Sequence, residues 1–161
     1  MIVDFHTHIF PPAIRQNRDK LFLSEPAFKL LYQSPKSRLV GAAKLLNAMN
    51  ENGVDKSVIF GFPWKNSDTF KVHNDYIMKT VQSYPDRFIG LGCFDPVSKD
   101  AIAEAERCLN SGMSGIGELA FYQGSYEREG RGFVIYDAAF GPLLSPSGSI
   151  DFLTGVVAYT S

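Results

Sequence analysis

The chain has 161 residues, of which 45% are hydrophobic, and its 16 basic and 17 acidic side chains give a formal net charge of −1. This composition is typical of one globular domain with a sizeable core, and it does not suit a disordered chain. The nearly balanced charge provides no electrostatic footprint for nucleic acid or for an anionic membrane.

Four apolar segments predict strands, and each is followed by a helical or a long connecting segment. They are residues 2–10, 56–62, 87–94 and 115–121. Their nearly continuous apolar character suits strands covered on both faces, as in a parallel sheet. Helical spacing of apolar residues predicts helices near 39–49, 67–81 and 98–109. This alternation predicts an α/β fold built from right-handed βαβ units.

Local signals mark the ends of these helices. Gly53 and Gly112 stand where left-handed C-terminal caps are expected, and Ser67 or Asp68 is the candidate N-cap of the second helix. Cys93 and Cys108 fall in a predicted strand and a predicted helix, a placement that favours buried free thiols over a disulfide framework.

The compartment is predicted from segments that the sequence lacks. The N-terminal residues form an apolar strand without a preceding basic region, and no apolar run approaches the roughly 18 residues of a membrane helix. With reduced cysteines, this pattern predicts a cytoplasmic protein without a signal peptide or a membrane span.

Residues 11–38 do not follow the alternation of strands and helices. This segment contains four prolines and scattered aromatic residues, and it is longer than an ordinary connection. It follows the first strand at the end where parallel strands direct their carboxyl termini, so one hypothesis is a substrate-covering loop of an α/β barrel. The alternative is a structural excursion with a short helix near residues 27–32.

Two histidines, His6 and His8, lie one residue apart near the end of the first strand. Because side chains alternate between the two faces of a strand, both imidazoles should point the same way, and imidazole nitrogens bind Zn²⁺, Mn²⁺ or Fe²⁺. Asp4 shares this face by parity, so it either orients an imidazole or is a buried carboxylate satisfied by backbone donors. Catalytic residues of α/β barrels gather at such strand ends.

Glu118 interrupts the apolar fourth strand in the segment GIGELAF. A buried carboxylate is costly unless it is paired or bound to a metal, so either a cationic group faces Glu118 or the residue has passed the strand end and is solvated. In the first case, the two histidines and Glu118 could converge on one ion or flank two. Aromatic residues that follow the strands either line an apolar substrate pocket or cap the core: Phe10, Phe62, Trp64 and Tyr122.

Three stretches, HTHIF, NDYIMKTVQSYPDRFIGLGCFDP and GIGELAF, together resemble the amidohydrolase superfamily, especially its amidohydrolase-2 group of metal-dependent hydrolases and decarboxylases. The resemblance covers residues 1–140 and implies a (β/α)₈ barrel of the TIM type with a divalent metal, zinc, manganese or iron, at its C-terminal face. His6 and His8 match metal ligands of the family. Glu118 is similar to the metal-bridging glutamate of TatD-like nucleases, which implies a ligand and a catalytic residue. The implied activity is hydrolysis of a small organic substrate by a metal-activated water, or decarboxylation.

The resemblance stops after Phe140. Family members supply further histidines and an aspartate from later strands, whereas the remaining histidine here, His73, has the helical setting of a solvated or packing residue, and the tail 141–161 has Asp151 as its one charged residue. A family barrel needs about 250 residues, so we expect the first half of a barrel followed by an atypical tail. A truncated or altered-frame product, or a homodimer in which half-barrels complete one another, would explain this. The chain could then be a catalytically incomplete metal-binding protein.

Overall fold

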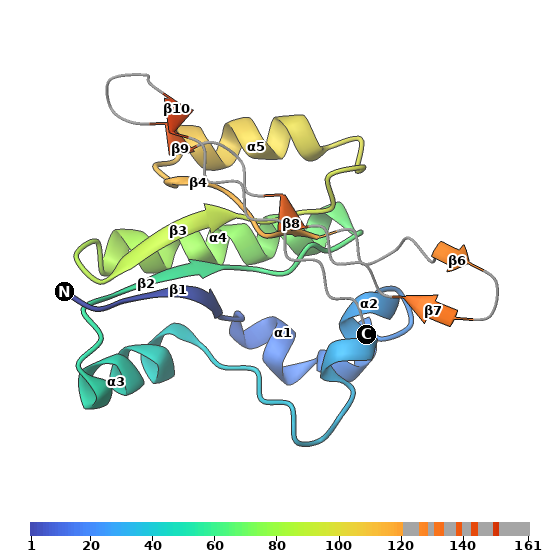
Figure 1. Cartoon of the computed structure of the whole chain (residues 1–161), viewed down its shortest axis with the longest axis horizontal. Coiled ribbons are helices and arrows are strands. Elements are labelled where there is room, and N and C mark those ends of the chain that lie inside the picture. The colour runs from blue at the N-terminus through green and yellow to red at the C-terminus, as the bar shows by residue number, and fades with distance from the viewer. Residues whose placement is uncertain (121–125, 129–130, 134–137, 140–142, 145–149, 152–161) are drawn as a thin grey trace.

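The computed structural model describes residues 1–120 and, beyond them, the short segments 126–128, 131–133, 138–139, 143–144 and 150–151. Its centre is a four-stranded parallel sheet with the strand order β1-β2-β3-β4 (Figure 1). Each strand pairs with the next along the chain, as in the βα repeat of an α/β barrel. The strands are β1 (Val3–His8), β2 (Lys56–Phe60), β3 (Phe88–Gly92) and β4 (Gly115–Ile116).

The fourth predicted strand is split. Only Gly115 and Ile116 pair with β3, and β5 (Leu119–Ala120) pairs instead with β8 (Ala138–Ala139) in an antiparallel ladder. Two further antiparallel pairs are formed by β6 (Tyr126–Arg128) with β7 (Arg131–Phe133) and by β9 (Leu143–Leu144) with β10 (Ile150–Asp151). The predicted boundary at residue 140 stays a prediction, because most of the tail lies outside the described residues.

The connections between the parallel strands carry the helices. The first contains α1 (Pro12–Gln16), the 3₁₀ turn η1 (Arg18–Leu21), α2 (Pro26–Tyr32) and α3 (Ala42–Asn52), and the next two contain α4 (Ser67–Ser83) and α5 (Ala101–Asn110). Helix α4 packs on β2 and β3, and α5 packs on β3 and β4. No helix in the described part of the chain has both the length and the apolar character needed to cross a membrane.

The predicted C-terminal stops of the helices agree with the structure, but three of the starts differ, beginning with α3, which starts at Ala42 rather than near residue 39. Gly53 and Gly112 have φ values of +67° and +88°, the left-handed conformation expected of a C-terminal stop. The N-cap of α4 is Asn66, whose side chain accepts a hydrogen bond from the Thr69 N–H, so the prediction of Ser67 or Asp68 was wrong by one or two residues. Helix α5 begins at Ala101, three residues after the predicted start.

The two faces of the sheet bury different residues. On β2, Ile59 faces a cluster formed with α4 and α5, whereas Val58 and Phe60 lie on the other face with Cys93. On β3, Gly90 lets α4 approach closely. Cys93 and Cys108 are both buried free thiols, as predicted.

Replacing Gly90 by alanine is expected to destabilise the fold by about 1–3 kcal/mol, because the site has no room for a methyl group. A Cβ at this position would lie 2.7 Å from Cγ2 of Val81 and 3.1 Å from Cγ2 of Ile77. Urea unfolding followed by circular dichroism measures the change. A transition midpoint equal to that of the parent protein would contradict this packing of α4 on β3.

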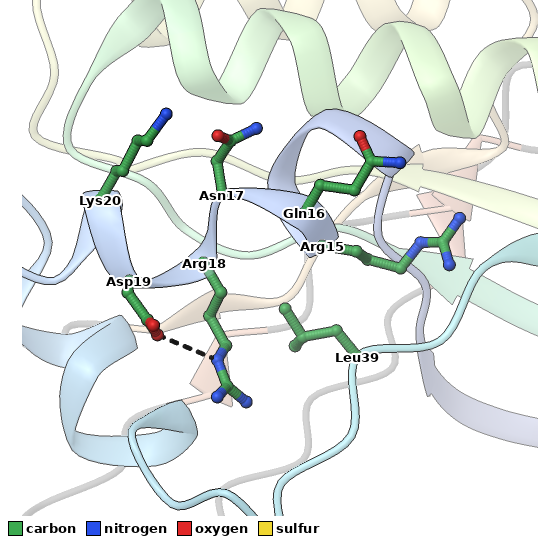
Figure 2. Close-up of a pocket in the computed structure, with 7 residues that line it drawn as sticks. All are labelled: Arg15, Gln16, Asn17, Arg18, Asp19, Lys20 and Leu39. Atoms are coloured by element: carbon green, nitrogen blue, oxygen red, sulfur yellow. Dashed lines mark hydrogen bonds and ion pairs between the residues drawn. The ribbon is translucent and has the colours of Figure 1, made fainter.

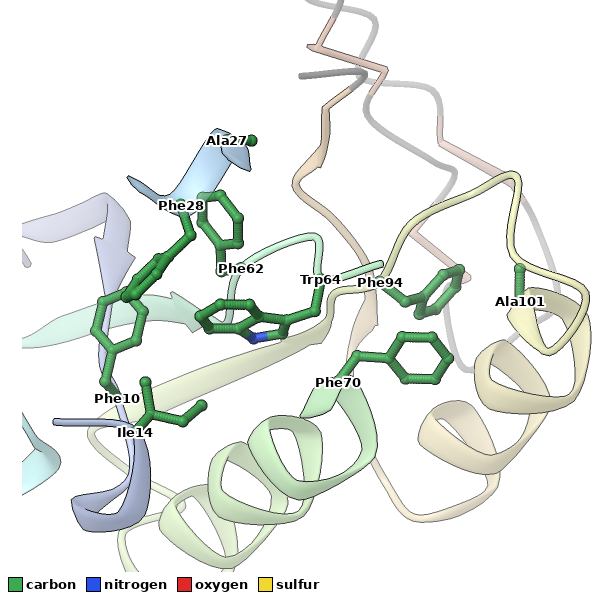
Figure 3. Packing of buried hydrophobic residues seen from close by; sticks show 9 residues of the cluster. All are labelled: Phe10, Ile14, Ala27, Phe28, Phe62, Trp64, Phe70, Phe94 and Ala101. Atoms are coloured by element: carbon green, nitrogen blue, oxygen red, sulfur yellow. The ribbon is translucent and has the colours of Figure 1, made fainter. Parts of the chain in front are cut away.

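The long segment after β1 is tied into the core at the carboxyl end of the sheet. Phe28 of α2 packs against Trp64 and Phe62, with ring centroids 4.6 and 5.5 Å apart (Figure 3). The buried carboxylate of Glu25 accepts hydrogen bonds from the backbone N–H groups of Lys65 (3.1 Å) and Asn66 (3.0 Å). The segment therefore contains the short helix of the structural interpretation, and a substrate-covering role stays a prediction.

Candidate metal centre

A bulge in β1 decides which of its side chains share a face. Asp4 is paired with Ser57, but the next paired residues are Thr7 with Ile59 and His8 with Phe60, so β1 contains one extra residue between these points. Such a bulge reverses the alternation of side chains beyond it. Asp4 therefore falls on the face opposite His8, and its parity-based placement beside the histidines was wrong. It is exposed, and its Oδ1 accepts a hydrogen bond from the His6 backbone N–H.

The two histidines lie on the same face of β1, as predicted. Their ring centroids are 5.1 Å apart, and both rings meet Phe60 of β2 edge to face, at 5.0 Å for His6 and 4.7 Å for His8. The His6 side chain is 57% exposed and that of His8 is 20% exposed. The pair thus stands at the carboxyl end of β1 with one ring open to solvent and one half-buried.

Glu118 follows β4 and faces both imidazoles. Its Oε2 lies 3.6 Å from Nε2 of His6 and 3.4 Å from Nε2 of His8, and one ligand atom of each residue lies within 4.8 Å of the others. The Glu118 side chain is only 12% exposed, which excludes the solvated alternative. The structure therefore brings the three predicted ligands together.

The tautomer of His8 is set by Gly61, the residue that follows β2. Its Nδ1 lies 2.7 Å from the carbonyl oxygen of Gly61, and a carbonyl only accepts, so the neutral ring carries its proton on Nδ1. The Nε2 lone pair then faces the Glu118 carboxylate. A backbone carbonyl that fixes the far nitrogen of the ring in this way is typical of metal-binding histidines.

Glu118 Oε2 is buried and has no hydrogen-bond partner among the described residues. Burial raises the pKa of this carboxyl, but the contact with His8 and the electrostatic effects of His8 and His6 lower it by more, so the net shift is downward. The carboxylate is therefore ionised near neutral pH. A buried ionised oxygen without a donor is costly unless a cation neutralises it.

This donor set fits a divalent cation. Two imidazole nitrogens and a carboxylate oxygen suit zinc, manganese or iron. Ligand atoms bonded at about 2.1 Å to a tetrahedral ion are about 3.4 Å apart. The two separations from Glu118, 3.4 and 3.6 Å, are close to this spacing.

Tyr32, at the end of α2, is a neighbour of this centre that the sequence analysis missed. Its ring meets Phe10 at 5.4 Å, and Phe10 in turn stacks with His8 at 6.4 Å. Burial, together with the negative charge of Glu118, raises the pKa of Tyr32 to about 12, so its phenol stays protonated near neutral pH. The only signal in the sequence was an aromatic residue in the long segment after the first strand.

The residues predicted to contact substrate have different placements. Phe10, Phe62 and Trp64 are at most 1% exposed and pack with Phe28 in one cluster (Figure 3). Tyr122 lies outside the described residues. Contact of these four residues with a substrate stays a prediction.

A surface hollow of about 370 Å³ lies over α1 and η1, away from the histidines. Figure 2 shows its side chains diverging: Lys20 points away from Arg18, which pairs with Asp19 at 3.4 Å. Neither histidine of the metal centre nor Glu118 lines it. The hollow therefore does not form part of this centre.

Comparison with known proteins identifies the fold. No protein-family model matches the sequence, and no curated protein is similar to it. Among solved structures, a 5-carboxyvanillate decarboxylase from Novosphingobium aromaticivorans, in complex with manganese and 4-hydroxy-3-methoxy-5-nitrobenzoic acid, is 21% identical over 72% of this chain and 40% of its own, with a TM-score of 0.58. A 4-oxalomesaconate hydratase from Rhodopseudomonas palustris is 24% identical over 72% of this chain and 41% of its own (TM-score 0.50). A protein described as amidohydrolase II is 19% identical over 72% of this chain and 39% of its own (TM-score 0.52).

These structural neighbours belong to the group that the sequence resembles, and they are barrel proteins of which this chain spans about two fifths, between 39% and 41%. The prediction of a partial (β/α)₈ barrel is confirmed. At these identities the likeness shows the fold and leaves the reaction open.

Proposed function

We propose that this chain carries the metal centre of an amidohydrolase-type, metal-dependent hydrolase that acts on a small organic substrate. The proposal rests chiefly on Glu118 Oε2, which is buried, has no hydrogen-bond partner among the described residues and lies 3.4 and 3.6 Å from two imidazole nitrogens. A divalent cation bound there would supply Lewis acidity, lowering the pKa of a coordinated water to about 7 and polarising a carbonyl oxygen.

The protein residues have separate tasks in this proposal. His8 offers Nε2 as a ligand because Gly61 holds its Nδ1 proton. His6, the more exposed of the two histidines, offers its Nε2 at the solvent side. Glu118 balances the charge of the cation and, as the catalytic carboxylate, can take up a proton. The phenol of Tyr32, protonated near neutral pH, can donate a hydrogen bond to a substrate oxygen.

Glu118→Gln is expected to weaken Mn²⁺ or Zn²⁺ binding by at least about tenfold, because the amide keeps the shape of the side chain but removes the charge that the cation needs. Loss of a partner that only orients a metal ligand already weakens binding by about 10- to 100-fold. Isothermal titration of the purified chain with each metal measures the effect. Glu51→Gln is the matched control, since Glu51 is exposed on α3. Equal affinities for the parent and both variants would reject Glu118 as a ligand.

Decarboxylation is a second candidate function. It is favoured by the decarboxylase among the structural neighbours, whose structure contains manganese and a substituted benzoic acid. A hydrolase releases two products from an amide or lactone, whereas a decarboxylase releases CO₂ from an aromatic carboxylic acid. Any turnover of one of these two substrate classes by the metal-loaded chain would distinguish the two functions.

A catalytically incomplete metal-binding protein is the third candidate. The chain has three histidines, and the third, His73, bonds to Trp64 and to the Ile9 carbonyl rather than facing the centre. Two histidines and one carboxylate would hold a cation weakly. We therefore expect weak or substoichiometric metal and no appreciable turnover for these 161 residues, and robust metal-dependent turnover would contradict this expectation.

A further inference from the structure

His73 lies on α4 directly behind the end of β1 and is completely buried. Its Nδ1 is 2.8 Å from the indole Nε1 of Trp64, and its Nε2 is 2.6 Å from the carbonyl oxygen of Ile9. The indole N–H only donates, so Nδ1 accepts, and Nε2 therefore carries the proton that is donated to Ile9. Both ring nitrogens are used, and the neutral ring has one defined tautomer.

The same ring also supports Gly61. A Cβ on Gly61 would lie 2.9 Å from Cγ and 3.0 Å from Nδ1 of His73, so only a glycine lets the backbone lie against the imidazole. Gly61 is the residue whose carbonyl accepts the Nδ1 proton of His8. Ile9, whose carbonyl accepts the hydrogen bond from His73, directly follows His8 in the chain.

His73 thus contacts the backbone near His8 at two points, Ile9 and Gly61. Its hydrogen bond to Ile9 fixes the backbone just after His8, and its ring fixes the position of the carbonyl that sets the His8 tautomer. Trp64 in turn fixes the tautomer of His73, because without the indole donor Nδ1 could take the proton and the bond to Ile9 would be lost.

We propose that His73, held by Trp64, is a positioning residue that keeps the His8 ring in the Nδ1-protonated tautomer with Nε2 directed at the cation site. The consequence for metal affinity rests on the proposed function, whereas the consequence for the His8 tautomer does not. Partners that orient a metal-binding histidine typically contribute 10- to 100-fold to affinity. Since His73 acts on His8 only through backbone groups, we expect its loss to weaken metal binding by about tenfold.

The experiment compares four variants of the purified chain with the parent. His73→Phe keeps an aromatic ring but removes both bonds, and His73→Gln can accept from Trp64 and donate to Ile9. Trp64→Phe removes only the indole donor and provides a second test if His73→Phe does not fold. Thr80→Val is the matched control: it removes another buried side-chain hydrogen bond on α4, to the Tyr76 carbonyl, away from β1.

Two readouts are measured. Long-range ¹H–¹⁵N correlation of the histidine rings in the metal-free protein reports the His8 tautomer, and Mn²⁺ titration followed by electron paramagnetic resonance reports affinity. We expect the Nδ1-protonated form of His8 in the parent, His73→Gln and Thr80→Val proteins. We expect a tautomer mixture and about tenfold weaker Mn²⁺ binding in His73→Phe and Trp64→Phe.

The outcomes separate the two proposals. A parent protein that binds no Mn²⁺ would contradict the metal centre, and the tautomer measurement would still test the role of His73. A folded Trp64→Phe or His73→Phe protein with the His8 tautomer of the parent would overturn the positioning role. Equal losses in Thr80→Val would also overturn it, because the effect would then follow from any lost bond on α4.

Discussion

The double variant His6→Ala, His8→Ala is expected to bind Mn²⁺ and Zn²⁺ at least about 100-fold more weakly. Removal of a residue that only orients a metal ligand already lowers metal affinity by about 10- to 100-fold, and here two ligands are lost. Both imidazole nitrogens face the buried oxygen of Glu118, at 3.6 and 3.4 Å. Without them the carboxylate is the one remaining member of the three-residue group. Metal content after equilibrium dialysis, with isothermal titration of the same samples, measures the loss.

The double variant also needs a test of folding. His6 is more than half exposed and His8 is half-buried, and neither is a member of the buried clusters, so we expect the core to persist without them. Urea unfolding of the metal-free protein should therefore show a cooperative transition for the variant. If the folded variant retained as much metal as the parent, the cation would be bound elsewhere and the assigned ligands would be wrong.

Acidification is expected to destabilise the metal-free protein by up to about 3 kcal/mol between pH 6.5 and pH 4 through His73 alone. Burial lowers the pKa of His73 from 6.5 to about 4; the hydrogen bond to Ile9 opposes this shift and the charge of His8 adds to it. In this pH window the unfolded chain binds a proton at this position and the folded chain does not. Unfolding therefore takes up a proton, and the free energy of unfolding falls as the pH falls.

The His73→Gln variant isolates this contribution. Glutamine does not titrate, so its free energy of unfolding should fall less steeply between pH 6.5 and pH 4 than that of the parent, whereas the carboxylates contribute equally to both proteins. Urea unfolding at three pH values across the window gives both slopes. Parallel slopes would show that His73 is not held neutral, and would contradict its burial between Trp64 and Ile9.

The sequence predicted most of the fold because the relevant signals are local. Continuous apolar runs indicated strands covered on both faces, and helical spacing indicated the helices between them. Gly53 and Gly112 marked helix ends because a helix often stops at a residue in the left-handed conformation, which glycine adopts at little cost. The start of α4 was misplaced because Asn66, Ser67 and Asp68 are all good N-caps, and the chain uses the first of them.

The errors have non-local causes. Alternation alone placed Asp4 beside the histidines, but the bulge in β1 depends on pairing with β2, and a period-two pattern does not reveal it. His73 looked like a solvated or packing residue from its helix alone. Its actual partners, Trp64 in the loop before α4 and the carbonyl of Ile9 just after β1, are 9 and 64 residues away in the sequence.

The metal centre was predictable as a set of residues but not as a geometry. Histidines at i and i+2 on a strand share a face, and an acidic residue inside an apolar strand indicates a cationic partner. The hydrogen bond from His8 to the Gly61 carbonyl joins residues 53 positions apart and follows only from the parallel pairing of β1 with β2.

Anomalous diffraction from crystals of the chain grown with ZnCl₂ would locate a bound cation and its ligands. We expect a strong zinc peak bonded, at about 2.0–2.2 Å, to Nε2 of His6, Nε2 of His8 and a carboxylate oxygen of Glu118. A zinc ion bound at other residues, or these three side chains directed into separate regions of solvent, would contradict the proposed site.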